Sequence, residues 1–350
     1  MRLGVHLPVA DFGDGLPTAT ALRDYVLAAR DTGFDTVAGN DHLRWRRPWL
    51  DGLGALAAVA ADAGPLTLAT TVALPVVRHP AVLASALTGL AALHPGPVVA
   101  GIGPGSGRAD YAAVGVPFAE RWSRFDAAAR ELRKLLADTG LPLWYASWGS
   151  QARLRALAAD ADGWIASGYN ARPAQYAAAR ATLDGHLRAA GRDPAAFPDL
   201  IATVWLQVTD SAAEAERLLC DVLGPALGRD PADLGHLPVG PPEHCARVLT
   251  DYAAAGARRV LLWPLRDGIR QLRRCGEEVA PHLPRWISAR ASDRPPRRRS
   301  RRGTAGARPS STHRGRPSRR GRCPPRRSRP TPRTPCRPGS PAARTPAPPC

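Results

Sequence analysis

The chain has 350 residues, and 48 Lys and Arg against 30 Asp and Glu give it a formal net charge of +18. A charge of this size is typical of proteins that bind nucleic acid or membranes, unless it is confined to one segment. Residues 289–350 hold 19 Arg and a single acid, Asp293, so residues 1–288 contain 29 basic and 29 acidic side chains. The larger part of the chain is therefore formally neutral, and its function is not indicated by the basic charge.

Two sets of signals limit where the protein works and what it binds. The beginning, MRLGVHLPVADFGDG, has no basic segment followed by an apolar stretch, and no run of 18 apolar residues occurs, so we expect a cytoplasmic protein with no membrane partner. The six cysteines form no Cys-x-x-Cys pair and no Cys/His spacing of a zinc site. We therefore expect neither a metal site nor a disulfide framework.

Short apolar runs rich in Val, Ile, Leu and Trp alternate with longer segments of helical period, which indicates repeated βα units around a parallel sheet. The predicted strands are, in chain order, 3–8, 34–40, 66–74, 97–103, 142–146, 163–168, 201–208 and 259–265. The predicted helices are 18–32, 49–62, 80–93, 118–138, 149–160, 173–190, 211–222 with 242–255, and 268–280. Eight strands with a helix after each predict a (β/α)8 TIM barrel, because open doubly wound sheets usually stop at about five or six strands.

The barrel is predicted to span residues 1–288 as one domain. Residues 289–350 combine 14 Pro and 5 Gly with Arg, Ser and Thr. So few apolar side chains cannot offset the entropy cost of ordering, and we predict a disordered Arg/Pro-rich C-terminal tail. This tail offers arginines for phosphate contacts but no aromatic residue for base stacking, so nucleic-acid binding is expected only through the tail, if at all.

Catalytic groups of such barrels lie at the carboxyl ends of the strands and in the loops that follow. The loops of this chain carry distinctive motifs there: DHL at 41–43, TVALPVVRHPAVLA at 71–84, GIGPGSGRADYAAVGVPFAERW at 101–122 and ADGWI at 161–165. Together with the ending GPPEHCARVLTDYAAAGARRVLLWPL, these motifs resemble the luciferase-like monooxygenase superfamily, and the resemblance covers residues 1–285. It implies a (β/α)8 barrel that uses either reduced FMN with oxygen or coenzyme F420, a deazaflavin that carries hydride, with the F420-dependent oxidoreductase type resembled most.

Two residues are predicted to take part in catalysis. His42 ends the second strand and follows an acid, so it could exchange a proton near neutral pH while a carboxylate holds it. The resemblance places it beside the flavin ring; the structural alternative is a histidine that caps the next helix. Asp41 is expected to orient His42 or to bond the ring edge, or else to cap the following turn.

The third and fourth strands are predicted to supply the surface for the ring. The resemblance implies a non-prolyl cis peptide among Thr70, Thr71 and Val72, where an ordinary strand is the alternative. Glycines after the fourth strand would let a flat ring approach the backbone closely. The family commonly has Trp-Asn, or Glu and Asn, in this loop, whereas this chain has Ser106 and Gly107. The predicted cofactor contacts in the loop are Gly103, Gly105, Ser106 and Gly107.

A phosphate site is expected where a glycine-containing loop begins a helix, because free N–H groups and the helix dipole favour an anion there. The loop ASWGSQA at 146–152 fits this pattern, and the resemblance carries the phosphate contacts onto Ser147, Gly149 and Ser150, with Gly168 after the next strand. A plain helix cap by Ser147 or Ser150 is the alternative. The nearby arginines 44, 46, 47 and 78 could attract an acidic cofactor tail.

The leading hypothesis is an oxidoreductase that transfers hydride between coenzyme F420 and a small organic substrate, with His42 assisting proton transfer. An FMN-dependent monooxygenase that uses oxygen is the first alternative. A non-catalytic barrel, or a nucleic-acid binder that acts through its tail, is the second. Relatives often form homodimers, so a homodimer is an open alternative for this chain.

Overall fold

The computed structural model describes residues 1–283. Within this part of the chain, eight parallel strands close into a ring, with each strand paired to its neighbours and β6 paired to β7. They are β1 (Arg2–His6), β2 (Thr36–Gly39), β3 (Thr67–Thr70), β4 (Val98–Ile102), β5 (Leu143–Ala146), β6 (Gly163–Ser167), β7 (Asp199–Val208) and β9 (Arg259–Pro264). The ring is completed by β9, which lies between β1 and β7 with Arg2 opposite Arg259 and Trp205 opposite Trp263. The predicted (β/α)8 barrel is confirmed, and all eight predicted strands are present.

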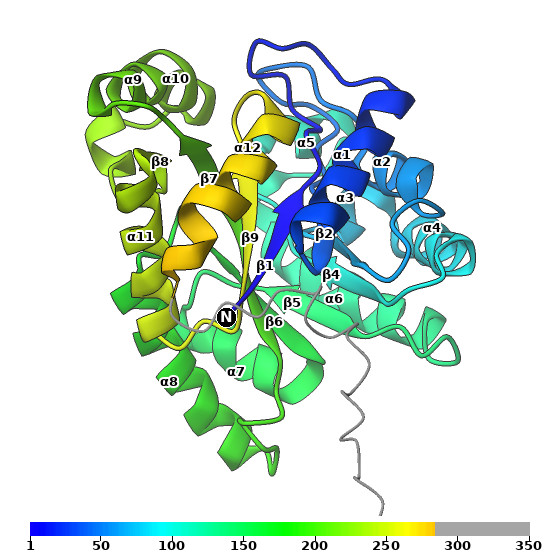
Figure 1. Ribbon diagram of the computed structural model, residues 1–350. Coiled ribbons are helices and arrows are strands. Elements are labelled where there is room, and N and C mark those ends of the chain that lie inside the picture. The colour runs from blue at the N-terminus through cyan, green and yellow to red at the C-terminus, as the bar shows by residue number, and fades with distance from the viewer. Residues whose placement is uncertain (284–350) are drawn as a thin grey trace, which may run out of the picture. The chain divides into compact units, whose positions relative to one another are not determined.

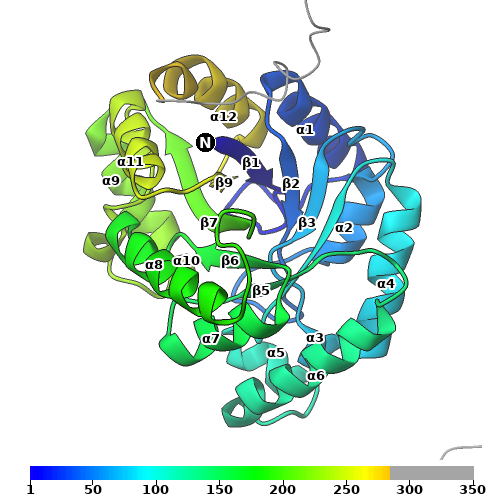
Figure 2. The ribbon, with the colours of Figure 1, turned by 90° about the horizontal axis from the view of Figure 1, so that it is seen from below.

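Helices surround the ring on its outer side (Figures 1 and 2). The main ones are α1 (Ala19–Thr32), α2 (Gly52–Val59), α4 (Pro80–Leu93), α6 (Arg121–Leu135), α7 (Gln151–Asp160), α8 (Pro173–Ala189), α11 (Pro242–Ala254) and α12 (Gly268–Arg274). Local chemistry sets their ends: the Thr18 side chain accepts from Ala21 N–H at the start of α1, and Gly33 ends it with φ of 104°. Pro80 and Pro173 occupy first-turn positions that need no N–H donor.

Several short elements depart from the predicted pattern. The predicted strand 66–74 is too long, because the sheet ends at Thr70 and the chain turns into α3 (Pro75–Arg78). Residues 108–113 form α5 (Arg108–Ala113), and residues 223–241, which lie between the predicted helices 211–222 and 242–255, contain α10 (Gly224–Leu227), a 3-10 turn and the two-residue strand β8 (Val239–Gly240). The helix predicted at 211–222 is α9 (Ala212–Leu218) followed by a π turn. These short elements have too few residues for a hydrophobic period to reveal them.

The core has two layers, as expected for a barrel. Between the strands and the helices lies a continuous apolar cluster that includes Leu3, Phe34, Leu132 and Trp164. Inside the ring a smaller cluster is formed by Ala38, Ala69, Val99, Trp144, Ile165, Leu200, Ala202 and Leu261. The interior tolerates large side chains only beside small ones: a Cβ at Gly163 would lie 2.4 Å from the Trp144 ring.

The predicted tail, residues 289–350, lies outside the described residues, as does the end of the predicted barrel from 284 to 288. None of the helices in residues 1–283 is long and apolar enough to cross a membrane.

Candidate functional site

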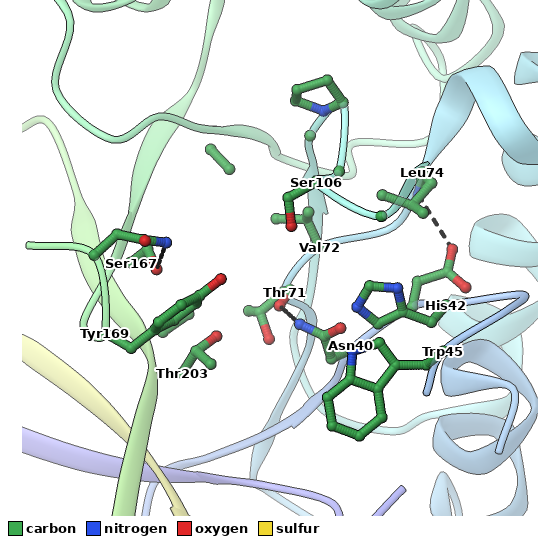
Figure 3. A pocket seen from close by; sticks show the side chains of 18 of the residues that line it. Asn40, His42, Trp45, Thr71, Val72, Leu74, Ser106, Ser167, Tyr169 and Thr203 are labelled. Carbon is green, nitrogen blue, oxygen red and sulfur yellow. Dashed lines mark hydrogen bonds between the residues drawn. The ribbon is translucent and has the colours of Figure 1, made fainter. Parts of the chain in front are cut away.

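A cavity of about 700 Å³ lies at the carboxyl ends of the strands and is bounded by the loops that follow them (Figure 3). Cavities of this size hold cofactors and drug-sized ligands, and in TIM barrels this end carries the active site. Figure 1 shows α9 and α10 at the end of the barrel toward which the β1 arrow points, and Ala226 and Leu227 of α10 line the cavity. Among the predicted site residues, the lining includes Asp41, His42, Thr71, Val72, Gly103, Gly105, Ser106, Gly107 and Ser147.

His42 is held by a carboxylate, but the partner is Asp110 rather than its neighbour Asp41. Nδ1 of His42 lies 2.7 Å from Oδ2 of Asp110, whose side chain is fully buried. The other oxygen of Asp110 accepts from the N–H groups of Leu43 and Arg44, each at 2.8 Å. An ionised carboxylate only accepts, so the neutral imidazole carries its proton on Nδ1. Nε2 is then an acceptor with no hydrogen-bond partner among residues 1–283, on a side chain that lines the cavity.

Asp41 does not orient His42, and the prediction that it does is wrong. Its carboxylate accepts from Arg78 Nε and Nη2, both at 2.7 Å, and from the Leu74 N–H at 3.1 Å. These bonds tie the end of β2 to the start of α3, and they draw the carboxylate toward that helix. The paired carboxylates of Asp41 and Asp51 raise the pKa of Arg78 above its usual value. Asp41 is thus a buried structural anion at the edge of the cavity.

The end of β3 has the conformation that the family resemblance implies. The peptide bond between Thr71 and Val72 is cis, and both side chains line the cavity. Asn40 donates from Nδ2 to the Thr71 carbonyl at 2.6 Å, so the loop after β2 supports this bend (Figure 3). Thr70 does not line the cavity, because its hydroxyl donates to the Gly101 carbonyl at 2.7 Å in the neighbouring strand.

Glycines allow the loop after β4 to pack against the loops after β2 and β3. A Cβ at Gly103 would lie 2.8 Å from Cγ2 of Val72. Gly105 has φ of 73°, a left-handed conformation that favours glycine. A Cβ at Gly107 would lie 2.3 Å from Oδ2 of Asp110 and 3.4 Å from Nδ1 of His42. Gly107 therefore leaves the space that the pair of His42 and Asp110 occupies.

The loop predicted to bind phosphate begins α7, a helix of 10 residues. Ser150 is the N-cap residue but makes no side-chain capping bond, and Ser147 accepts from the Gly149 N–H at 3.1 Å. Neither Ser147 nor Ser150 caps the first N–H groups of α7, so the alternative prediction of a plain helix cap is wrong. Gly149 and Ser150 do not line the cavity, although Ser147 and the exposed Trp148 do.

Gly168 is buried away from the cavity. A Cβ there would lie 2.3 Å from Val204, its N–H donates to the Ala202 carbonyl at 2.7 Å, and its carbonyl accepts from the Tyr252 hydroxyl. These contacts give Gly168 a packing role between β6, β7 and α11 rather than a ligand contact.

A second histidine lies just beneath the cavity and was not predicted. His6 is fully buried and stacks on Trp263 with ring centroids 4.4 Å apart. Burial lowers the pKa of His6 to about 3, so the ring is neutral, and its Nε2 accepts from the Thr203 N–H at 3.0 Å. Thr203 lines the cavity at an irregularity of β7 with φ of 59°, a conformation that β-branched residues seldom adopt.

Positive charge dominates the lining of the cavity. Arg44, Arg46, Arg108 and Arg121 contribute to it, whereas Asp41 is its only acid among the residues that the structure describes. Asp41 is neutralised by Arg78, which does not line the cavity. The site therefore attracts anionic groups.

Comparison with known proteins decides the family. The model of the luciferase-like monooxygenase family matches residues 1–235. The chain belongs to this family. The chain is 32% identical over 136 residues to an F420-dependent glucose-6-phosphate dehydrogenase of Nakamurella multipartita, a match that covers 36% of this chain and 37% of the relative. It is also 32% identical over 199 residues to an F420-dependent hydroxymycolic acid dehydrogenase of Mycobacterium tuberculosis, covering 48% and 53%. The chain thus matches between about a third and a half of the length of these curated relatives.

A solved structure has the same barrel fold over nearly its full length. The F420-dependent secondary alcohol dehydrogenase, in complex with an F420-acetone adduct, aligns with a TM-score of 0.69 and 16% identity, over 81% of this chain and 99% of that chain. At this identity the likeness concerns the fold.

Two further cavity features were not predicted as site residues. Asp110 lies within the motif at 101–122 and Asn40 directly precedes the motif at 41–43, yet no spacing in the sequence pairs Asp110 with a histidine 68 positions earlier. Trp45, Trp49, Trp205 and Trp263 also line the cavity. Their distribution over three separate segments is the reason that no local pattern reveals them.

Proposed function

We propose that this protein is an oxidoreductase that transfers hydride between coenzyme F420 and a small organic substrate bound in the cavity. The observation that carries the proposal is the His42 side chain, which is anchored at Nδ1 by buried Asp110 and leaves Nε2 unpartnered at the cavity. Such an anchored imidazole can hold or accept a proton at one stated atom. The F420-dependent activities of the two relatives support the choice of cofactor.

The residues present fit a flat anionic cofactor. The cavity has room for a ring system, and the absence of a side chain at Gly103 lets Val72 pack against the loop after β4 in the cavity wall. The uncapped start of α7 at Ser150 offers N–H groups to a phosphate, and the arginines at the opening favour an acidic tail. When bound, F420 supplies the hydride chemistry.

This chain's residues then perform three tasks. Thr71 and Val72 supply a firm cavity wall that Asn40 braces through the Thr71 carbonyl. His42 Nε2 accepts a proton from a substrate hydroxyl, or the imidazolium returns one to a carbonyl in the reverse direction. Asp110 keeps the imidazole oriented and stabilises the positive charge that forms when Nε2 is protonated.

Titration of the purified full-length chain with F420 and with FMN tests the proposal. The two cofactors differ in absorbance and fluorescence, so binding of each is measured directly. We expect F420 to bind, and we expect the His42→Asn variant to bind it normally but to lose turnover with any substrate found. Absence of F420 binding overturns the proposal. Binding of FMN alone with reduced-flavin oxygen uptake would instead establish the monooxygenase alternative.

We also propose that residues 1–288 act as one catalytic unit. Comparison of the full-length chain with a chain ending at residue 288 tests this, with F420 affinity as the readout. Equal affinities support the proposal. A salt-sensitive nucleic-acid affinity that the shorter chain lacks would assign a separate role to residues 289–350, and sedimentation of both chains would decide whether the unit is a homodimer.

A further inference from the structure

The two sides of the cavity differ in the size and chemistry of their side chains. Beside β5 and β6 the strands contribute mostly small side chains, Ala146, Ala166 and Ser167 with Ile165, and the loops that follow add Ser147, Trp148 and Tyr169. The opposite side is formed by an aromatic wall, which we define as Trp45, Trp49, Trp205 and Trp263. Figure 3 shows His42 and Trp45 on one side of Thr71 and Val72, with Ser167 and Tyr169 on the other.

The aromatic wall is continuous through direct ring contacts. Trp45 and Trp49 have centroids 4.8 Å apart, Trp49 and Trp263 5.6 Å, and Trp263 and Trp205 4.4 Å. The last pair is stacked with an interplanar angle of 23°, and Trp205 is further supported by the edge contact of Phe12 at 5.1 Å. Trp205 and Trp263 are fully buried, and Trp263 is stacked between Trp205 and His6, so these two rings support the wall from behind. The part of the wall that a ligand can contact is formed by half-buried Trp45 and Trp49, which this packing holds in fixed orientations.

His42, the residue proposed to exchange a proton with the substrate, lies on the same side of the cavity as the aromatic wall. His42 contacts Trp49 edge to face with centroids 4.7 Å apart, and Trp45 lies 6.2 Å away. A substrate atom that exchanges a proton with Nε2 of His42 must come within hydrogen-bond distance of it. The rest of such a substrate is then placed against the aromatic wall.

Two arginine side chains lie next to this wall and have no carboxylate partner among residues 1–283. Arg44 and Arg46 flank Trp45 in sequence, are exposed and line the cavity. Neither guanidinium pairs with a carboxylate within residues 1–283, and the contact of Arg46 is the Pro225 carbonyl at 3.5 Å. The other two lining arginines, Arg108 and Arg121, lie instead over the Phe118 ring at 4.6 and 4.1 Å from its centroid, and Arg121 also donates to the Phe118 carbonyl. Arg44 and Arg46 are therefore the cations left for an anionic group near the wall.

From these observations we infer that the substrate is a planar aromatic compound carrying an anionic group, with its ring against the aromatic wall and its anion at Arg44 and Arg46. The inference rests on the proposed function, because the place of His42 in proton transfer sets the side on which the substrate binds. The aromatic wall and the two arginines contribute separately to substrate binding: the wall favours a flat ring, and the arginines favour a negative charge.

Binding of three probes to the full-length chain loaded with F420 tests this assignment by calorimetry. The probes are 2-naphthoate, its neutral analogue 2-naphthamide, and cyclohexanecarboxylate, which keeps the charge but lacks the aromatic ring. We expect 2-naphthoate to bind about tenfold more tightly than either of the others, since stacking and a charge-assisted contact each contribute about this factor. Equal affinity of the acid and the amide, or of the naphthyl and cyclohexyl acids, overturns the inference.

Variants assign the effect to the residues named. Arg44→Gln and Arg46→Gln should weaken 2-naphthoate about threefold to tenfold and leave 2-naphthamide unchanged, as expected for charges at a rim. Arg188→Gln, an exposed arginine of α8 outside the cavity lining, is the matched control and should change neither. Trp45→Leu should weaken both naphthyl probes to a similar degree.

The same arginines could instead hold the acidic tail of the cofactor, and one further measurement separates the two. If Arg44→Gln and Arg46→Gln weaken F420, but not a deazaflavin fragment without phosphate and tail, and leave 2-naphthoate unchanged, the cations serve the cofactor and the inference fails. Failure of F420 to bind at all counts against the proposed function. The probe affinities of the chain without cofactor still decide the substrate class in that case.

Discussion

The Asp110→Asn substitution changes the site at the atom on which the proposed function depends. In the native protein one carboxylate oxygen accepts from two backbone N–H groups, and the other accepts from His42 Nδ1 at 2.7 Å. An asparagine can keep the two backbone bonds through its amide oxygen. Its NH2 group then faces Nδ1, which must become the acceptor, so the proton of the neutral imidazole moves to Nε2.

The size of the effect follows from the bond that is lost. A hydrogen bond to a charged group contributes about 1.5–3 kcal/mol, and here the donor charge develops only when His42 is protonated. Loss of that amount in the transition state lowers kcat/KM by about 10- to 100-fold. The unfolding free energy should fall by about 1–3 kcal/mol, because the fully buried carboxylate also anchors the loop after β2.

Nitrogen-15 NMR of the histidine rings provides the assay that needs no substrate. The wild type should show His42 protonated at Nδ1 when neutral, and Asp110→Asn should show it protonated at Nε2. F420 affinity should be the same in both, since Asp110 is not itself part of the cavity lining. A wild-type His42 with its proton on Nε2, or a variant with unchanged tautomer and unchanged turnover, would refute the reasoning.

Four other substitutions test separate parts of the structure. Gly107→Ala should reproduce the tautomer change, because its Cβ would displace the Asp110 carboxylate, and the same NMR experiment reports it. Arg78→Gln should lower the unfolding free energy in urea by about 3 kcal/mol, because buried Asp41 loses its partner, and adding Asp41→Asn should restore most of the loss. Ser150→Ala should change the stability of the cofactor-free chain by less than about 0.5 kcal/mol, since the Ser150 side chain makes no capping bond, and it should leave F420 affinity unchanged, because Ser150 does not line the cavity and its backbone N–H remains. His6 has a pKa lowered from 6.5 to about 3, so the unfolded state binds more protons between these values and stability falls as the pH drops through this window. This contributes about 1.4 kcal/mol per pH unit, and His6→Gln should remove that part of the slope between pH 6.5 and 5 in urea unfolding.

The fold was predictable from the sequence because its signals are local. Each strand is a short apolar run, and its helix follows at a regular distance, so the number of βα units could be counted without knowing how they pack. The bounds of α4, at Pro80 and Leu93, were predicted to the residue because Pro80 marks its start. The end of β3 was predicted too late in the chain. The apolar run continues to residue 74, whereas the chain leaves the sheet after Thr70.

The site was predictable only in part. His42, Thr71 and Val72 were identified because they stand in short motifs at strand ends, and the structure places all three at the cavity. The partner of His42 was misassigned because the neighbouring acid in sequence was the obvious candidate, whereas Asp41 turns toward Arg78. Contacts between residues on different strands follow from closure of the barrel, which local patterns do not contain.

In the loop after β4 the family resemblance leads us to expect Trp-Asn, or Glu and Asn, whereas this chain has Ser106 and Gly107, and the structure gives the glycine a physical reason. A side chain at position 107 would occupy the space of the Asp110 carboxylate, since its Cβ alone would lie 2.3 Å from Oδ2. A larger residue there and the observed pair of His42 and Asp110 therefore exclude each other. The loop lacks a side-chain amide that could contact a ring, and in the same place it admits a buried carboxylate that orients the imidazole. The loop therefore loses a possible amide contact to the ring and gains the carboxylate that orients His42. For this reason Ser106 and Gly107 do not count against cofactor binding.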